Sequence, residues 1–237
     1  MKTKLNLRLL GLVLGVGSIL GAESGMRDEI NQSVLPEVPG YAWTTTVSPQ
    51  NSRARLISID GKAEKNGPVS LTLRFGDRTV QGYLYGNKAF VTSPDTKWKA
   101  VPEMEKGETP GQFMDRMVRG VTPPAKEIVR LTKVAGELRK EGDVFVGELP
   151  EGGARGLVES RRRGPRNEEP ELKNASGSVK FWTKEGAINK YEFTVRGKTM
   201  VAGKETDFDQ TTVVEIKEVG TARVEVPEHV KQKLGIP

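Results

Sequence analysis

Histidine and cysteine, which supply many catalytic and metal-binding sites, are almost absent from this sequence, and no recognisable catalytic set occurs in it. The only histidine is His229, near the C-terminus, and there is no cysteine. A Ser-His-Asp device would have to use His229, yet the chain has no Gly-x-Ser-x-Gly turn to present the serine. A zinc site would need mostly carboxylates, which is uncommon. We therefore expect no enzyme activity, no cofactor and no metal, with an exported hydrolase as the last alternative.

Two further patterns could bind ions, and both are weak. Asp207-Phe208-Asp209 offers two carboxylates to a calcium ion, but the run lacks the glycine and the later glutamate of an EF-hand loop. We interpret it as part of a polar loop. Gly11, Gly15 and Gly17 do not form a phosphate-binding loop, because they belong to an apolar N-terminal segment.

That N-terminal segment has the form of a secretory signal peptide. Lys2, Lys4 and Arg8 precede the apolar stretch Leu9–Ala22, which is too short to span a bilayer comfortably. We expect cleavage after Ala22, and an anchoring N-terminal helix is the alternative. Without cysteine the chain cannot be a lipoprotein, and disulfide-free exported domains are typical of bacteria. The expected location is the periplasm.

The composition favours one sheet-rich domain. The chain has 237 residues, 35% of them hydrophobic, with 27 glycines and 14 prolines, which indicates many turns. Loss of the leader lowers the formal net charge from +6 to about +3, too little to suggest nucleic acid as a partner. We predict a signal peptide over residues 1–22, a flexible segment over 23–40, and a single domain over 41–237.

The first part of that domain reads as an antiparallel meander. In the run from Val69 to Phe75 the apolar side chains alternate with polar ones, as in a strand with one buried face. Gly76-Asp77 and Gly86-Asn87 provide hairpin turns. The expected strands are Tyr41–Val47, Leu56–Glu64, Val69–Phe75, Arg78–Tyr85, Lys88–Thr92 and Lys97–Val101, the last of which contains Trp98.

A helical insert is predicted next, over about residues 109–140. Thr109 caps a first helix that begins at Pro110, and Pro123-Pro124 begins a second whose apolar stripe includes Leu138. A short helix is expected at Gly153–Arg161. The charged run that follows, about residues 161–175, is typical of a solvated loop.

A second meander closes the chain, before a final helix at about Glu228–Leu234. Its expected strands are Ser178–Thr183, Ile188–Arg196, Thr211–Val219 and Thr221–Val226, with a polar loop between the second and third and a tight break at Gly220. Helices inserted between two meanders predict an α+β fold. We expect a large curved antiparallel β-sheet, an unclosed half-barrel, with helices covering its concave face.

This arrangement resembles the LolA-like family of periplasmic carriers. The resemblance is carried by the meander with Gly82-Tyr83 and Lys97-Trp98-Lys99, by the helical insert, and by the late meander that begins Val179-Lys180-Phe181-Trp182. It covers most of residues 41–234 and is a likeness of element order rather than of a short motif. It implies an apolar cavity for acyl chains under the helices.

The resemblance implies a non-catalytic module that carries or senses a lipid, a lipoprotein or another apolar ligand. Implied partners are a lipid or an acylated protein, an envelope protein and a membrane surface contacted peripherally; we expect a monomer. The alternative is a structural or protein-interaction module of the envelope that has no ligand, because its concave face is filled by its own helices. The candidate cavity wall is Leu71, Leu73, Phe75, Tyr83, Phe113, Met117, Tyr191, Phe193 and Val195. If the fold is a helix-covered half-barrel, Val69–Phe75 and Tyr191–Val195 should present their apolar sides to its concave face, beneath Phe113, Met117, Ile128 and Leu131 of the helical insert.

Overall fold

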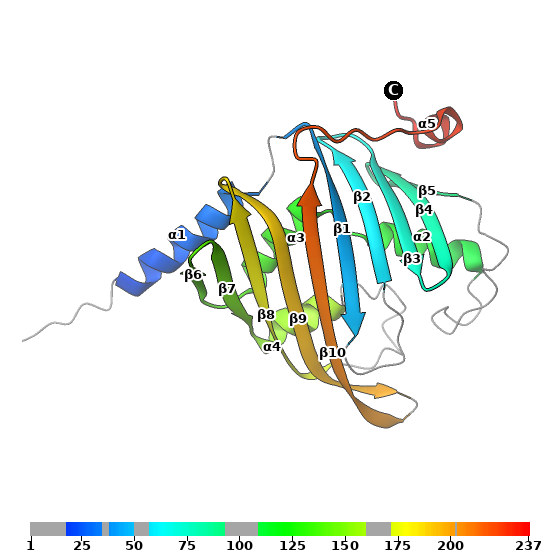
Figure 1. Ribbon diagram of the computed structural model, residues 1–237. Coiled ribbons are helices and arrows are strands. Elements are labelled where there is room, and N and C mark those ends of the chain that lie inside the picture. Colours follow the sequence, from blue (N-terminus) through cyan, green and yellow to red (C-terminus); the bar gives the residue numbers. More distant parts are fainter. Residues whose placement is uncertain (1–17, 35–37, 50–56, 93–108, 160–171, 202) are drawn as a thin grey trace, which may run out of the picture.

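A single sheet with helices on one side makes up the part of the chain that the structure describes. The computed structural model describes residues 18–34, 38–49, 57–92, 109–159, 172–201 and 203–237. The strands are β1 (Gly40–Pro49), β2 (Ile57–Glu64), β3 (Val69–Phe75), β4 (Arg78–Tyr85), β5 (Lys88–Val91), β6 (Leu138–Glu141), β7 (Val144–Leu149), β8 (Lys173–Lys184), β9 (Ala187–Val201) and β10 (Lys204–Lys217). The helices are α1 (Ser18–Gln32), α2 (Pro110–Gly120), α3 (Pro124–Val134), α4 (Glu151–Glu159) and α5 (Glu228–Leu234) (Figure 1).

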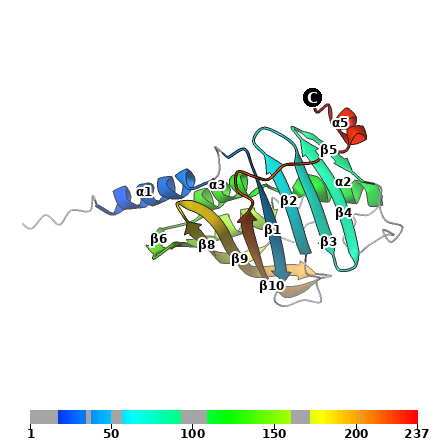
Figure 2. The same ribbon diagram turned by 45° about the horizontal axis from the view of Figure 1, so that its top comes forward.

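The sheet has ten antiparallel strands in the order β5-β4-β3-β2-β1-β10-β9-β8-β7-β6. The two meanders meet at its centre, where β1 pairs with β10. The sheet curves, and α2, α3 and α4 lie along one of its faces in both views (Figures 1 and 2). The α+β class and the open sheet with one-sided helical cover, both predicted from the sequence, are confirmed.

The strand register connects the apolar sides of the two meanders. Directly opposed residues of an antiparallel pair point to the same face of the sheet. Leu73 opposes Ile59, Ile59 opposes Thr45, Thr45 opposes Val214, and Val214 opposes Tyr191. Both apolar sets named from the sequence therefore lie on one face, as expected. We call it the inner face, because the helices cover it.

The helices bury the side chains that the sequence pattern selected. Thr109 caps α2: its hydroxyl accepts from the Gln112 backbone amide, and the Gln112 side chain accepts from the Thr109 amide. Apolar residues at helical spacing then face the sheet, namely Phe113, Met114 and Val118 of α2, Ile128 and Leu131 of α3, and Ala154, Leu157 and Val158 of α4. These residues join the strands' inner side chains in one hydrophobic core.

The segment before the sheet is not the flexible lead-in that we expected. Helix α1 occupies much of it, and Ile30 is fully buried. The Arg27 guanidinium donates to the carbonyls of Thr132, Ala135 and Gly136, where α3 ends and its last carbonyls lack helical partners. Lys140 also pairs with Glu29, with Nζ 2.6 Å from Oε1. No local pattern predicted this docking, because the partners are more than a hundred residues apart in the sequence.

A long hairpin replaces the polar loop expected after Arg196. Strands β9 and β10 pair from Glu215↔Lys190 to Lys204↔Val201. Opposite charges face each other across it: Arg196 Nε lies 3.0 Å from Asp209 Oδ2, and Lys198 Nζ lies 2.9 Å from Glu205 Oε1. These cross-strand pairs let a polar sequence form a ribbon. Asp207-Phe208-Asp209 is therefore in a strand, not in a loop.

The prediction of a last strand over Thr221–Val226 is also wrong. β10 ends at Lys217, residues 218–221 form a turn, and residues 222–227 belong to no strand. Gly220 takes a φ of +81° and donates its amide to the carbonyl of Gly40 at 2.8 Å. The Val224 amide donates to the Glu64 side chain at 2.7 Å. The segment thus crosses the end of β1 and β2, and its alternating pattern comes from packing on one side only.

Several predicted boundaries shift. The helical insert ends at Val134, and Leu138 begins strand β6 instead of extending α3. Strand β8 begins at Lys173, inside the predicted charged loop, whose residues 161–171 lie outside the described part. The expected strand with Trp98 also lies outside it. Among the described residues, no helix is long and apolar enough to cross a membrane.

Candidate ligand cavity

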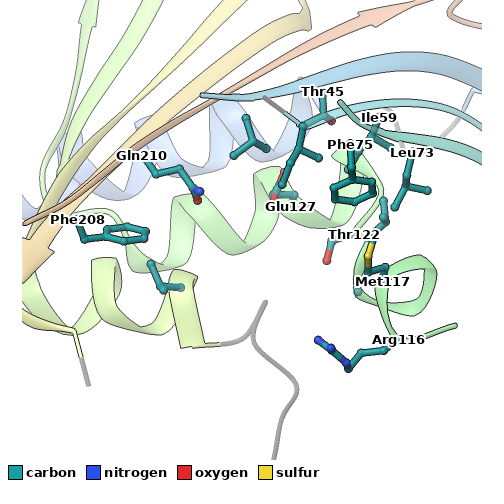
Figure 3. Close-up of a pocket in the computed structure, with 15 residues that line it drawn as sticks. Thr45, Ile59, Leu73, Phe75, Arg116, Met117, Thr122, Glu127, Phe208 and Gln210 are labelled. Atoms are coloured by element: carbon teal, nitrogen blue, oxygen red, sulfur yellow. The ribbon is translucent and has the colours of Figure 1, made fainter. Parts of the chain in front are cut away.

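A cavity of about 310 Å³ lies between the inner face of the sheet and the helices. Its wall is mainly apolar, with a few polar side chains (Figure 3). The lining residues are Thr45, Val47, Ile57, Ile59, Leu73, Phe75, Arg116, Met117, Gly120, Val121, Thr122, Glu127, Val158, Phe208 and Gln210. This volume is at the lower end of the range for small-molecule sites, about 300–1,000 Å³.

Central strands provide the sheet side of the wall in two cross-strand rows. Thr45, Ile59 and Leu73 form one row across β1, β2 and β3. Val47, Ile57 and Phe75 form the next. Phe208 and Gln210 extend the wall onto β10, in the part of the long hairpin nearest the cavity. All these positions belong to the inner face, so register alone brings them together.

The break between α2 and α3 forms the helix side of the wall. Helix α2 ends at Gly120, Val121 is extended at its C-cap, and Pro124 begins α3. Met117, Gly120, Val121 and Thr122 line the cavity from this break. Proline at a helix start fixes the break, because it cannot continue the preceding helix. The two short helices therefore do not cover the sheet continuously.

The polar groups of the wall differ in depth. Glu127 of α3 is 5% exposed, and its Oε2 accepts a hydrogen bond of 2.7 Å from the Tyr191 hydroxyl. Arg116 of α2 is only partly buried, and its guanidinium carbon lies 5.2 Å from the Phe113 ring centroid. The cavity thus has a buried carboxylate in its wall and a cation nearer the solvent.

The one histidine of the sequence, His229, is not part of the cavity wall. His229 stacks edge-on against Phe90 at 5.8 Å, and Phe90 opposes Tyr83 on the outer face, away from the cavity. No group of three or more His, Cys, Asp or Glu side chains suited to a metal ion occurs among the described residues. Tyr41 lies on the same apolar side of the sheet as the cavity. Burial raises the pKa of its phenol, and a hydrogen bond with the Ala125 backbone lowers that pKa by a smaller amount, so the phenol stays neutral.

The residues selected from the sequence fall into three groups. Leu73, Phe75 and Met117 line the cavity. The second group lies on the covered side but is packed into the core without lining the cavity: Leu71, Phe113, Tyr191, Phe193 and Val195. Tyr83 opposes Ser70, whereas its neighbour Gly82 opposes inner-face Leu71, so Tyr83 points to the outer face.

Most residues of the cavity wall were not predicted from the sequence. The strand residues Thr45, Val47, Ile57 and Ile59 alternate in the expected way, but nothing in the sequence showed that β1 and β2 are central. Phe208 was hidden in a polar run. Glu127 lies one residue before the apolar Ile128 of α3, and its position on the buried side of that helix was the signal that could have identified it.

Comparison with known proteins adds only distant structural likenesses. No protein-family model matches the chain, and neither does any curated protein. LprF from Mycobacterium bovis aligns over 86% of this chain and 97% of its own, at 8% identity and a TM-score of 0.40. The LolA superfamily protein NE2245 from Nitrosomonas europaea aligns over 88% of this chain and 96% of its own, at 9% identity and a TM-score of 0.31. A putative outer membrane lipoprotein-sorting protein domain from Vibrio parahaemolyticus aligns over 90% of this chain and 95% of its own, at 11% identity and a TM-score of 0.27.

These likenesses are too distant to add to the architecture. The fold rests on the chain's own features, namely one open antiparallel sheet, a helical insert between two meanders, and helices over one face of the sheet.

Proposed function

We propose that this chain is an exported bacterial envelope protein that binds a lipid, an acylated protein or another apolar ligand without chemical change. The observation that supports this is the cavity of about 310 Å³ with its mainly apolar wall. Transfer of apolar ligand surface from water into such a wall is favourable by roughly 25 cal/mol per Å². A structural module with a filled interior has no use for this space.

Filling the cavity tests the proposal. Ile59 lies in the middle of the wall, on the inner face of β2. We expect Ile59→Trp to place its larger ring in the cavity and to weaken binding of a fluorescent fatty acid at least tenfold, about 1.4 kcal/mol. The measurement is a fluorescence titration, with the unfolding of both proteins followed by urea.

The matched control is Ser58→Trp. Ser58 is the preceding residue of β2 and opposes Arg74 and Thr46 on the outer face. The same indole one residue away should leave fatty-acid binding unchanged. Equal binding by wild type and Ile59→Trp would contradict the cavity as the site, and no binding by the wild type would favour the structural module.

Export is the second part of the proposal, and it makes the location periplasmic. We expect the exported protein to begin at Glu23, because Ala22 supplies the small residue directly before the cut, although Leu20 at the third position back is larger than the usual residue there. Such a cut keeps Arg27 and Ile30, which dock α1 onto the domain. N-terminal sequencing of protein recovered from the periplasm is the measurement. Recovery of a chain that still begins at Met1 in the membrane fraction would show an anchor instead.

A further inference from the structure

The cavity carries two opposite charges at different depths. The Glu127 carboxylate is nearly inaccessible and accepts the Tyr191 hydroxyl, whereas the Arg116 guanidinium is partly exposed. In Figure 3, Arg116 lies beyond Met117 and Thr122, on the side of the space away from Thr45. Apolar side chains of the sheet and helices occupy the wall around and between the two charges. Such an arrangement gives an amphiphile a preferred direction.

The position of Arg116 suits the recognition of an anion. Its guanidinium carbon lies over the Phe113 ring, 5.2 Å from the ring centroid. A guanidinium can form paired hydrogen bonds to a carboxylate or phosphate through the N–H groups of its edge. Phe113 is 5% exposed, so the ring that supports the guanidinium is itself held in the core. A supported arginine loses less side-chain freedom on binding than a free one.

The cavity volume limits the size of the apolar part. An apolar cavity of about 150 Å³ holds one benzene molecule, so about 310 Å³ corresponds to roughly two such rings, or about 12 carbon atoms. This is one acyl chain of moderate length and not the several chains of a fully acylated lipoprotein. The buried Glu127 carboxylate disfavours a ligand that enters with an anionic group first.

We propose that the cavity selects a single-chain amphiphile with an anionic head, its chain among the apolar wall residues and its carboxylate or phosphate at Arg116. This inference rests on the proposed ligand-binding function and names the class of ligand. Arg116 acts as the specificity residue. Thr122, which lies between Arg116 and Glu127 in the view of Figure 3, can donate its hydroxyl to the same head group.

The experiment compares three 12-carbon probes of different head charge: dodecanoate, dodecyl phosphate and dodecylamine. Each displaces the fluorescent fatty acid from the wild type, from Arg116→Gln and from Arg116→Lys, below the concentration at which the probe forms micelles. We expect Arg116→Gln to bind both anionic probes about tenfold more weakly and dodecylamine no more weakly. Arg116→Lys keeps the positive charge but loses the planar guanidinium group. Its affinity for the anionic probes should therefore lie between those of the wild type and Arg116→Gln. Added salt should weaken anionic binding more in the wild type than in Arg116→Gln.

Arg119→Gln is the matched control on the same helix. Arg119 does not line the cavity: its Nε lies 2.7 Å from Asp115 Oδ2, and it donates to the Asn87 carbonyl at 2.8 Å. The affinities of Arg119→Gln for the three probes should equal those of the wild type. The ratio of dodecyl phosphate to dodecanoate binding tells a phospholipid-type head from a fatty-acid head, with the Arg116 effect expected in both.

Two results would overturn the inference in different ways. If the wild type binds all three probes alike and Arg116→Gln changes none of them, the ligand class is wrong while the binding function stands. If the wild type binds no probe and no fluorescent fatty acid, the proposed function fails, and the inference fails with it. Unfolding curves of each variant show whether a lost affinity comes from a lost fold.

Discussion

Replacing Phe193 with alanine should lower the free energy of unfolding by about 3–5 kcal/mol, the usual cost of deleting a buried aromatic ring. Phe193 is 3% exposed and opposes Val179 and Thr212 on the inner face. It belongs to the main hydrophobic core and does not line the cavity. Its neighbours would lose contacts on removal of the ring, and the β-sheet around it can relax only partly.

Met117→Ala is the companion variant, because Met117 belongs to the cavity wall. Its side chain is partly buried and already faces open space, so its removal deletes fewer contacts. We expect a loss of about 2 kcal/mol, the low end of the range for methionine truncation, with a clear change in fatty-acid affinity. Phe193→Ala should leave the affinity of the folded protein near that of the wild type.

Urea unfolding and fatty-acid titration of both variants separate the two roles. Equal stability losses, together with no fatty-acid binding by the wild type, would contradict the cavity and leave the filled structural module. A change of affinity in Phe193→Ala alone would mean that the ligand sits nearer β9 than the cavity does.

Local sequence signals predicted the hairpins of the first meander well, because their turns depend on neighbouring residues. Gly76 and Gly86 have φ values of +60° and +59°, as their places in the expected turns require. The capped start of α2 at Thr109 was predicted for the same reason. Each of these features is decided within a few residues of chain.

The cavity wall could not be predicted in this way, because it depends on contacts between distant segments. Thr45 becomes a central wall residue only because β1 pairs with β10, whose Val214 opposes it. The long charged hairpin likewise depends on cross-strand pairs that a polar loop would not make. The alternating pattern predicted the apolar side of each strand, but it did not predict which strands would lie next to the break between α2 and α3.

Tyr83 shows how an aromatic residue can mislead. The inner side of β4 carries Val80 and Gly82, and a Cβ on Gly82 would come within 2.6 Å of the Val118 side chain. Glycine is thus the residue that lets α2 approach the sheet, and period two puts Tyr83 on the other face. Tyr83 was chosen as the inward residue of β4 because its side chain is large, and this choice assigned it to the wrong face of the sheet.

Gly61→Ala should also destabilise the protein strongly, by about 3 kcal/mol, the upper part of the range for overpacking. Gly61 of β2 opposes Trp43 of β1 on the inner face. A Cβ at this position would lie 2.2 Å from Cζ2 and 2.4 Å from Cε2 of the indole. Trp43 is 1% exposed, so its ring cannot move aside without displacing other core residues.

The matched control is Gly156→Ala in α4. A Cβ there meets nothing within 4 Å, and alanine has the higher helix propensity. It should therefore raise the free energy of unfolding by up to about 1 kcal/mol. The opposite signs of the two Gly→Ala substitutions would separate the steric effect at Gly61 from the general effect of alanine on the unfolded chain.

A double-mutant cycle with Trp43→Leu identifies the partner. If the indole is what Gly61 accommodates, Trp43→Leu removes the clash, and the two substitutions together should cost at least about 1 kcal/mol less than the sum of their separate effects. Additive losses in urea unfolding would show that another neighbour opposes the new methyl group. Because Thr45 and Ile59 lie next along the inner sides of the same strands, the clash should also distort the cavity wall. Fatty-acid affinity should accordingly fall in Gly61→Ala and recover in part in the double variant.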